Sequence, residues 1–257
     1  VVRLQGPIGM GGRRGLSIER LAAPLERAFD MSGISAVALV INSPGGSAAQ
    51  SALIASRIRA LADEKKLPVY AYVEDVAASG GYWIACAADE IVADANSIVG
   101  SIGVIAASFG FEDLMRRIGV RRRLYTAGTR KSLLDPFGPE KQEDVERLRA
   151  LQDEIHANFR NWVSLRRGAK LPVSRDALFT GEFWTGARAR DFGLIDALGD
   201  ARGDLRRRFG EKVRFRGVLV GGRSLRGLLG LARADGAWPD DLVDSLETRA
   251  IWARYGL

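Results

Sequence analysis

The feature that most constrains this chain is an alternation of short aliphatic runs and helical periodicity. The run AVALVI at 36–41 is continuously apolar and ends in turn residues, which is typical of a buried strand. From about Ala48 apolar residues recur at helical spacing as far as the charged stretch 63–66, and a second strand is predicted at 69–73. These elements form one β-α-β unit.

The same pattern then repeats along the chain. A short apolar helix is expected around 81–88, followed by a strand at 91–93 and an apolar stretch at 98–105. Repeated β-α units predict an α/β fold with largely parallel strands.

Further elements are expected in the rest of a core domain over residues 1–200. They are a helix over 112–118, a strand over 120–126, a long amphipathic helix over 139–167, and a strand at 194–195 after the helix C-cap Gly193. The tail, 201–257, combines a basic helix, a Gly-rich segment and an amphipathic end with Trp238, Leu242, Leu246, Ile251 and Trp252. We expect this extension to dock on the core or on a neighbouring subunit.

Composition narrows the classes of protein. The 257 residues are 47% hydrophobic and 27% charged, which suits a folded globular chain. The net charge is +7, but the arginines are spread over several short runs, so a solvated surface is favoured over a nucleic-acid partner. No apolar span reaches the ~20 residues that a bilayer crossing requires. Localisation stays open between cytoplasmic and membrane-associated, with peripheral membrane association as an alternative.

Histidine and cysteine offer little for catalysis. The one histidine, His156, lies within the long predicted helix, where a packing or surface role is favoured over that of a base. A His-based triad and a multi-His metal site therefore lose support, and no metal or cofactor is expected. The single Cys86 lies in an apolar stretch and is expected to be a buried, inert thiol.

Ser79 is the first candidate for chemistry. It lies in VAASGGYW, directly after a strand and at the start of an apolar helix, where a nucleophile gains exposure and help from backbone amides. Gly80 permits an unusual backbone and a close approach of substrate. The alternative is that Ser79 is only a helix N-cap and the glycines only make a turn.

Lys131 is the second candidate. The chain contains 6 lysines against 32 arginines, so a lysine in TAGTRKSLLDPF calls for an explanation. Burial lowers the pKa of a lysine and allows it to act as a base, whereas arginine cannot do so at neutral pH. An ordinary surface lysine is the alternative.

The segment NSPGG at 42–46 is the third candidate. Its glycines follow a buried strand, where they can present backbone N–H groups to a developing oxyanion. A common strand-to-helix turn is the alternative, and Ser101 in IVGSIG is an unremarkable hydroxyl by itself.

Together these residues resemble peptidase family S49, bacterial signal peptide peptidase A and its relatives, in the short form with one catalytic domain. The resemblance covers roughly residues 1–200. It is carried by INSPGGS at 41–47, PVYAYVEDVAASGGYWIACAADEIVA at 68–93, SIVGSIGV at 97–104, the lysine segment before DPF, and LFTGEFWTGARARDFGLID at 178–196.

The resemblance implies a ClpP/crotonase-like spiral α/β fold and a Ser-Lys dyad. Ser79 falls on the nucleophile position and Lys131 on the general base position, 52 residues apart. Ser101 matches the hydroxyl that orients the lysine, and Gly46 and Gly80 lie where oxyanion-hole amides are expected, with Gly45 as an alternative to Gly46. The implied substrates are hydrophobic peptides such as remnant signal peptides, and the implied assembly is a homo-oligomer.

Two other function classes stay open. A crotonase-type enzyme would use the same fold and the two oxyanion-hole amides to bind an acyl-CoA thioester, without a covalent serine. A catalytically inert scaffold would use its basic surface and terminal helix to bind a membrane or a partner protein.

Overall fold

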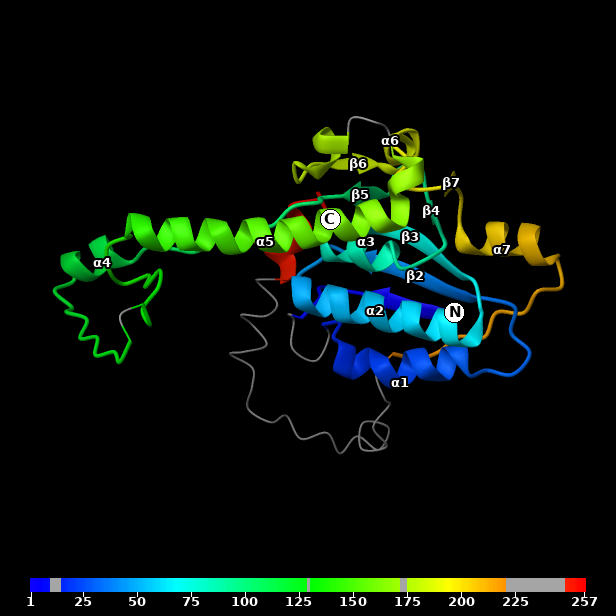
Figure 1. Cartoon of the computed structure of the whole chain (residues 1–257), viewed down its shortest axis with the longest axis horizontal. Helices are drawn as coiled ribbons and strands as arrows, with labels where there is room; N and C mark the ends of the chain where they lie inside the picture. The colour runs from blue at the N-terminus through cyan, green and yellow to red at the C-terminus, as the bar shows by residue number, and fades with distance from the viewer. Residues whose placement is uncertain (10–14, 129, 172–174, 221–247) are drawn as a thin grey trace. The chain divides into compact units, whose positions relative to one another are not determined.

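The computed structural model describes residues 1–9, 15–128, 130–171, 175–220 and 248–257 (Figure 1). It divides into two compact units. Unit 1 comprises Val1–Gly103 and Phe159–Leu257, and unit 2 comprises Val104–Asn158. The residues of unit 1 are therefore separated in the sequence by those of unit 2.

Unit 1 is built on a seven-stranded sheet. The main path runs β1-β2-β3-β4-β7, and β5 pairs with both β3 and β6. Every pairing is parallel except β5 with β6. The strands are β1 (Val2–Gln5), β2 (Val37–Ser43), β3 (Val69–Ala78), β4 (Glu90–Ala93), β5 (Ile98–Gly100), β6 (Phe183–Thr185) and β7 (Ala197–Leu198).

Helices connect these strands in the alternating order that the sequence predicts. The helices of unit 1 are α1 (Ile18–Phe29), α2 (Ala48–Lys65), α3 (Gly80–Ala85), α6 (Gly186–Asp191) and α7 (Ala201–Phe209). Unit 2 contains α4 (Glu112–Arg117), and α5 (Gln142–Arg167) begins in unit 2 and ends in unit 1. Two 3-10 helices, at Gly168–Lys170 and Arg175–Phe179, follow α5.

Successive residues of β2 face opposite sides of the sheet, as a strand requires. Val37, Leu39 and Ile41 belong to the large core that also contains the buried residues of α1 and α2. Ala38 instead packs in a second cluster with Leu205 of α7. Both faces are thus covered, which explains why β2 reads as an unbroken apolar run.

Helix α2 begins and ends where its sequence signals lie. The Ser47 hydroxyl accepts a hydrogen bond from the Gln50 amide at the N-cap. Lys66 adopts a left-handed conformation at the C-cap, and its amide donates to the Ala62 carbonyl. The charged stretch 63–66 therefore marks the end of the helix, as predicted.

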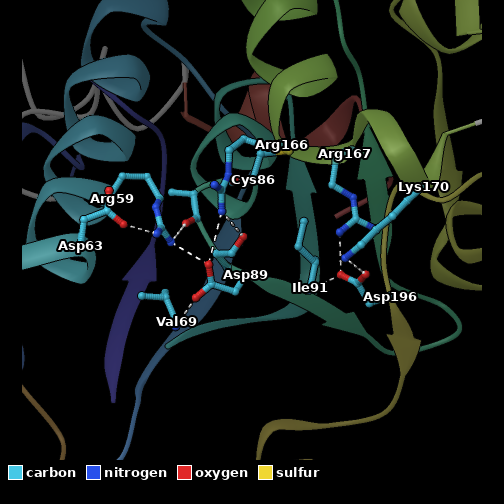
Figure 2. A network of polar contacts seen from close by, with 12 residues as sticks. Arg59, Asp63, Val69, Cys86, Asp89, Ile91, Arg166, Arg167, Lys170 and Asp196 are labelled. Atoms are coloured by element: carbon cyan, nitrogen blue, oxygen red, sulfur yellow. Dashed lines mark hydrogen bonds and ion pairs between the residues drawn. The ribbon is translucent and has the colours of Figure 1, made fainter. Parts of the chain in front are cut away.

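A polar network joins the last turn of α5 to the sheet (Figure 2). Arg167 is 3% exposed; its Nη1 lies 2.6 Å from Asp196 Oδ2, and its Nε and Nη2 donate to the Gly193 carbonyl. Lys170 also binds Asp196, whose Oδ2 accepts the Ile91 amide of β4 at 2.8 Å. The buried Arg167 and Asp196 thus have their polar groups satisfied by one another and by the backbone of Gly193 and Ile91.

A second branch of the network is centred on Asp89, directly before β4. Arg59 and Arg166 both donate to Asp89 Oδ1, and the Val69 amide donates to Oδ2 (Figure 2). Arg166 also donates to the Cys86 and Ala88 carbonyls that follow α3. The end of α5 therefore fixes the position of the segment between α3 and β4.

Two expected elements differ from the structure. The prediction of a strand over 120–126 is wrong, because these residues form no regular element and are exposed. All described strands belong to unit 1, so the apolar residues of this segment have no strand to pair with in their own unit. The strand at 194–195 is displaced to β7; Leu194 and Ile195 are buried but unpaired with the sheet.

The tail is described only in part. Its basic helix is α7, and Ile251 and Trp252 lie in a short helix near the chain end, where Trp252 packs beside Val76 and Ala78. Trp238, Leu242, Leu246 and nearly all of the Gly-rich segment lie outside the described residues. Within the described ranges, no helix combines the length and apolarity needed to span a membrane.

Candidate active site

Ser79 occupies the single position between strand β3 and helix α3. Its backbone has φ 52° and ψ −122°, a conformation that costs an L-residue energy and is found mainly where function demands it. The Ser79 amide donates to the Gly100 carbonyl at 2.8 Å, and its carbonyl accepts the Trp83 amide at 3.0 Å. Neighbouring elements therefore hold the strained turn from both sides.

The N-cap alternative fits this geometry poorly. Ser79 stands at the cap position of α3, but its hydroxyl makes no capping hydrogen bond. A serine placed for capping would adopt an extended backbone and bond the N2 or N3 amide. The strain at Ser79 and its half-buried side chain instead match a nucleophile turn.

The loop after β2 lies directly against this turn. A Cβ added to Gly45 would lie 2.8 Å from the Gly80 nitrogen, and one added to Gly80 would lie 3.4 Å from the Gly46 nitrogen. At Gly46, with φ 145°, a Cβ would lie 2.1 Å from the Ile8 carbonyl oxygen. Only glycine fits at position 46, because any side chain there would clash with the Ile8 backbone. The glycine loop can therefore pack closely against residues that are distant in the sequence.

The backbone hydrogen bonds separate Gly46 from Gly45. The Gly45 amide donates to Ser43 Oγ at 3.3 Å, so it is already engaged. Within the described residues, neither the Gly46 nor the Gly80 amide has a recorded acceptor. Two neighbouring amides without an acceptor are what an oxyanion requires, which favours Gly46 over Gly45.

Ser101 follows β5 and is buried. It has φ 55°, and its amide donates to the Glu182 carbonyl at 2.7 Å. Since Gly100 accepts the Ser79 amide, Ser101 lies one residue from a direct backbone partner of Ser79. The structure therefore places Ser79, Ser101, Gly46 and Gly80 in one region of unit 1, as the sequence predicts.

Lys131 lies in unit 2, on an exposed turn, with its amide donating to the Gly128 carbonyl. The residues after it are fixed within that unit. The Leu134 amide donates to Asp144 Oδ2, and Asp135 Oδ2 lies 2.8 Å from Arg122 Nε. The pairing of Lys131 with Ser79 remains a prediction.

Asn42 has a role that its sequence did not reveal. It is 6% exposed and its Nδ2 donates to Asp75 Oδ2 at 2.5 Å, which ties the end of β2 to β3 beside the glycine loop. Its Oδ1 is buried without a partner in the described residues. Nothing in the spacing of Asn42 and Asp75, 33 residues apart, would have paired them.

Cys86 is buried in unit 1, and His156 lies in unit 2. Burial raises the pKa of the Cys86 thiol to about 12, so the thiolate nucleophile is absent at neutral pH. His156 lies on α5 within unit 2 and is half-buried. Both positions agree with the packing roles that the sequence indicates.

Comparison with known proteins gives the family. The model for peptidase family S49 matches residues 61–209, more than half of the chain, and this range includes Ser79, Ser101 and Lys131. A putative protease of Methanocaldococcus jannaschii is 36% identical over 166 residues, covering 65% of this chain and 52% of its own length. The chloroplastic serine protease SPPA of Arabidopsis thaliana is 35% identical over 201 residues, covering 77% of this chain and 29% of its own length.

A third relative bears a different name. The Na(+)/H(+) antiporter NhaA of Brucella abortus is 53% identical over 272 aligned positions, which cover the whole of this chain but 36% of the relative. The chain thus spans about a third of that protein. The antiporter name describes the longer protein, whereas the family model matches the chain itself.

The sheet, its covering helices and the serine turn define a mixed α/β protein of the ClpP-like class. Within that class the chain belongs to peptidase family S49. The names of its relatives, which include protease 4 of Haemophilus influenzae, agree with a serine peptidase.

Proposed function

We propose that this protein is a serine endopeptidase that cleaves hydrophobic or unfolded peptides through an acyl-enzyme. The observation that carries the proposal is the strained backbone of Ser79 beside the amides of Gly46 and Gly80, which have no acceptor among the described residues. Strain at a single serine, with amides placed for an oxyanion, is what acyl transfer requires and what a plain turn does not. Membership of family S49 supports the same chemistry.

The reaction follows from the roles of these groups. Neutral Lys131 accepts the proton of Ser79 Oγ as the oxygen attacks the peptide carbonyl, and the Gly46 and Gly80 amides stabilise the resulting oxyanion. The protonated lysine then gives its proton to the leaving amine. A water molecule, activated by the same lysine, releases the acyl group and restores Ser79. No metal or cofactor takes part in these steps.

Ser79→Ala and Lys131→Ala test the dyad. Each variant should lose cleavage of an unstructured apolar peptide by at least about a thousandfold, because nucleophile and base act as one unit. Lys141→Ala, a second exposed lysine of unit 2, is the matched control and should keep full activity. Undiminished turnover in both dyad variants, with circular dichroism unchanged, would contradict the proposal.

Covalent labelling separates the peptidase from the two alternatives. A serine-directed phosphonate followed by peptide mass spectrometry should label Ser79 in the wild-type protein and nothing in Ser79→Ala. Binding of acyl-CoA without labelling would favour the crotonase-type enzyme. Neither labelling nor peptidase activity, together with steeply salt-dependent binding to anionic vesicles, would favour the inert scaffold.

A further inference from the structure

Tyr255 is buried, although the residues next to it in the sequence are exposed. Its side chain is 7% exposed, whereas Arg254 and Gly256 on either side are open to solvent. The ring meets Phe183 of β6 edge to face, with centroids 5.1 Å apart and planes at 68°. It also packs with Val76 and Ala78, the residues of β3 that lead into Ser79. The chain near its end is therefore seated on the strand that carries the candidate nucleophile.

The hydroxyl of Tyr255 contacts two parts of the candidate site. It lies 3.4 Å from the Pro44 carbonyl oxygen and 3.5 Å from Ser101 Oγ, and both contacts are longer than an ordinary O–H···O hydrogen bond. Pro44 belongs to the loop that contains Gly45 and Gly46. One side chain thus links the oxyanion loop to the hydroxyl expected to orient the lysine.

The Tyr255 hydroxyl is the donor in both contacts, to the Pro44 carbonyl oxygen and to Ser101 Oγ. A carbonyl oxygen only accepts, whereas a serine hydroxyl can both accept and donate. Ser101 therefore keeps its own proton and a further lone pair for another partner. One phenolic hydroxyl shared between the two oxygens restricts where Ser101 Oγ and the Pro44 carbonyl can lie.

The backbone of Ser101 adds to this restriction. Its φ of 55° and its amide bond to Glu182 hold the residue in one orientation, and its side chain is buried. A buried hydroxyl without a partner can rotate about its side-chain bond. Tyr255 limits that rotation, because its hydroxyl donates to Ser101 Oγ.

We infer that Tyr255 is a positioning residue of the peptidase reaction: its hydroxyl holds in place both Ser101 Oγ, the group expected to orient the lysine, and the Pro44 carbonyl of the oxyanion loop. The inference rests on the proposed function, since it acts through Ser101, Lys131 and Gly46. Tyr255 itself does not touch the reacting atoms. Nothing in the sequence marks this tyrosine, because its contacts are with residues 154 and 211 positions away.

Tyr255→Phe tests the role of the hydroxyl alone. The variant keeps the ring against Phe183, so it should fold normally and keep its KM for an apolar peptide. Its kcat should fall about threefold to tenfold, the effect of losing one hydrogen bond in the reacting arrangement.

Tyr72→Phe is the matched control. Its hydroxyl is also buried and donates to Asp204 Oδ2 at 2.8 Å, but it lies in the cluster under α7 and away from Ser101. This variant should keep the kcat and the KM of the wild type, whatever it loses in thermal stability. If Tyr255→Phe lowers kcat no more than Tyr72→Phe does, the inference is overturned.

The rate of phosphonate labelling at Ser79 separates a failure of this inference from a failure of the proposed function. Slower labelling of Tyr255→Phe than of wild type and Tyr72→Phe supports the inference, because it reports activation of the nucleophile without a peptide substrate. Equal labelling of all three overturns the inference while leaving the proposed function intact. If wild-type Ser79 is not labelled and Ser79→Ala keeps its activity, the proposed function fails and the role of Tyr255 fails with it.

Discussion

At the scale of single residues, the backbone conformation that positions Ser79 between β3 and α3 destabilises the fold. A non-glycine residue at φ 52° and ψ −122° costs on the order of 1–3 kcal/mol, and that cost is recovered elsewhere in the fold. The hydrogen bonds of its amide and carbonyl to Gly100 and Trp83 hold the conformation. A residue without a reactive role would be expected to relax or to be a glycine.

Ser79→Gly should therefore raise stability while it removes activity. Glycine adopts this backbone without steric cost, so the free energy of unfolding should increase by about 1 kcal/mol relative to Ser79→Ala, which keeps the strained Cβ. Urea unfolding of the two variants measures the difference. A glycine variant no more stable than the alanine variant would show that the turn is unstrained.

At the scale of elements, the sequence indicates most of the strands and helices around the site. AVALVI predicts β2 because burial of the strand on both faces leaves a continuous apolar run. The apolar spacing after Ala48 predicts α2 because one face of that helix is buried. Strand β1 and helix α1 carry weaker signals and were not predicted. Their places depend on pairing with β2 and packing on α2, which no local pattern encodes.

The residues of the candidate site also divide into those that the sequence indicates and those that it does not. Short motifs at strand ends indicate Ser79 and the two glycines, whereas Ser101 is indicated only by the resemblance to family S49. Asn42 with Asp75, and Tyr255 with Ser101, were not predicted because each pair forms only when distant segments fold together. Such contacts depend on the tertiary fold and leave no spacing that can be recognised in one sequence.

The close approach of α3 to α2 gives an element-scale prediction. A Cβ at Gly80 would lie 2.3 Å from Ser51 Oγ, which itself donates to the Ser47 carbonyl. Gly80→Ala should destabilise the protein by about 1–3 kcal/mol, the usual cost of overpacking. Adding Ser51→Ala removes the clashing oxygen, so the double variant should lose less than the sum of the two single variants.

Thermal or urea unfolding of the four proteins in the cycle measures this coupling. Gly217→Ala is the control, because a Cβ there meets nothing within 4 Å and the variant should be neutral. If the changes in the free energy of unfolding at positions 80 and 51 are strictly additive, the Cβ at position 80 does not clash with Ser51, and the prediction fails.

The network around Asp196 predicts a dependence of stability on pH. Burial alone would raise the pKa of this carboxyl, but hydrogen bonds from Arg167, Lys170 and the Ile91 amide outweigh it, and the pKa lies below its ordinary value of 3.8. A lowered folded-state pKa stabilises the fold above the unfolded-state pKa, and this contribution is lost as pH falls below about 3.8.

Asp196→Asn should remove this contribution. Because it leaves the buried Arg167 without its charged partner, the free energy of unfolding at pH 7 should fall by about 3 kcal/mol. Its stability should also vary less with pH between about 2 and 5 than that of the wild type. Asp191→Asn, which loses an ion pair half-exposed on both sides, should cost at most about 1 kcal/mol.

At the scale of the whole molecule, exposed apolar side chains are concentrated in unit 2. Ile105, Phe109, Ile118 and Tyr125 are between 62% and 89% exposed. Large apolar side chains that are exposed in such number are typical of a surface that contacts another molecule. They support the expectation that the protein assembles with copies of itself.

Light scattering coupled to size-exclusion chromatography tests that assembly. The wild-type mass should be a multiple of the 27.9 kDa chain, and Phe109→Asp should shift it toward the single chain because a charge cannot be buried at such a contact. Leu219→Asp, at a position of unit 1 that is 73% exposed, should leave the mass unchanged. A wild-type protein that elutes as one chain at all concentrations would contradict the expectation.

The division of unit 1 into two stretches of sequence, 1–103 and 159–257, has a consequence for synthesis on the ribosome. The serine turn and the glycine loop emerge early, but β7 and Tyr255 are translated more than a hundred residues after Ser79. Domains acquire their contacts as their residues emerge. A nascent chain would therefore hold the nucleophile long before Ser101 gains its partner, and full peptidase activity would wait until nearly the whole of this sequence had been translated.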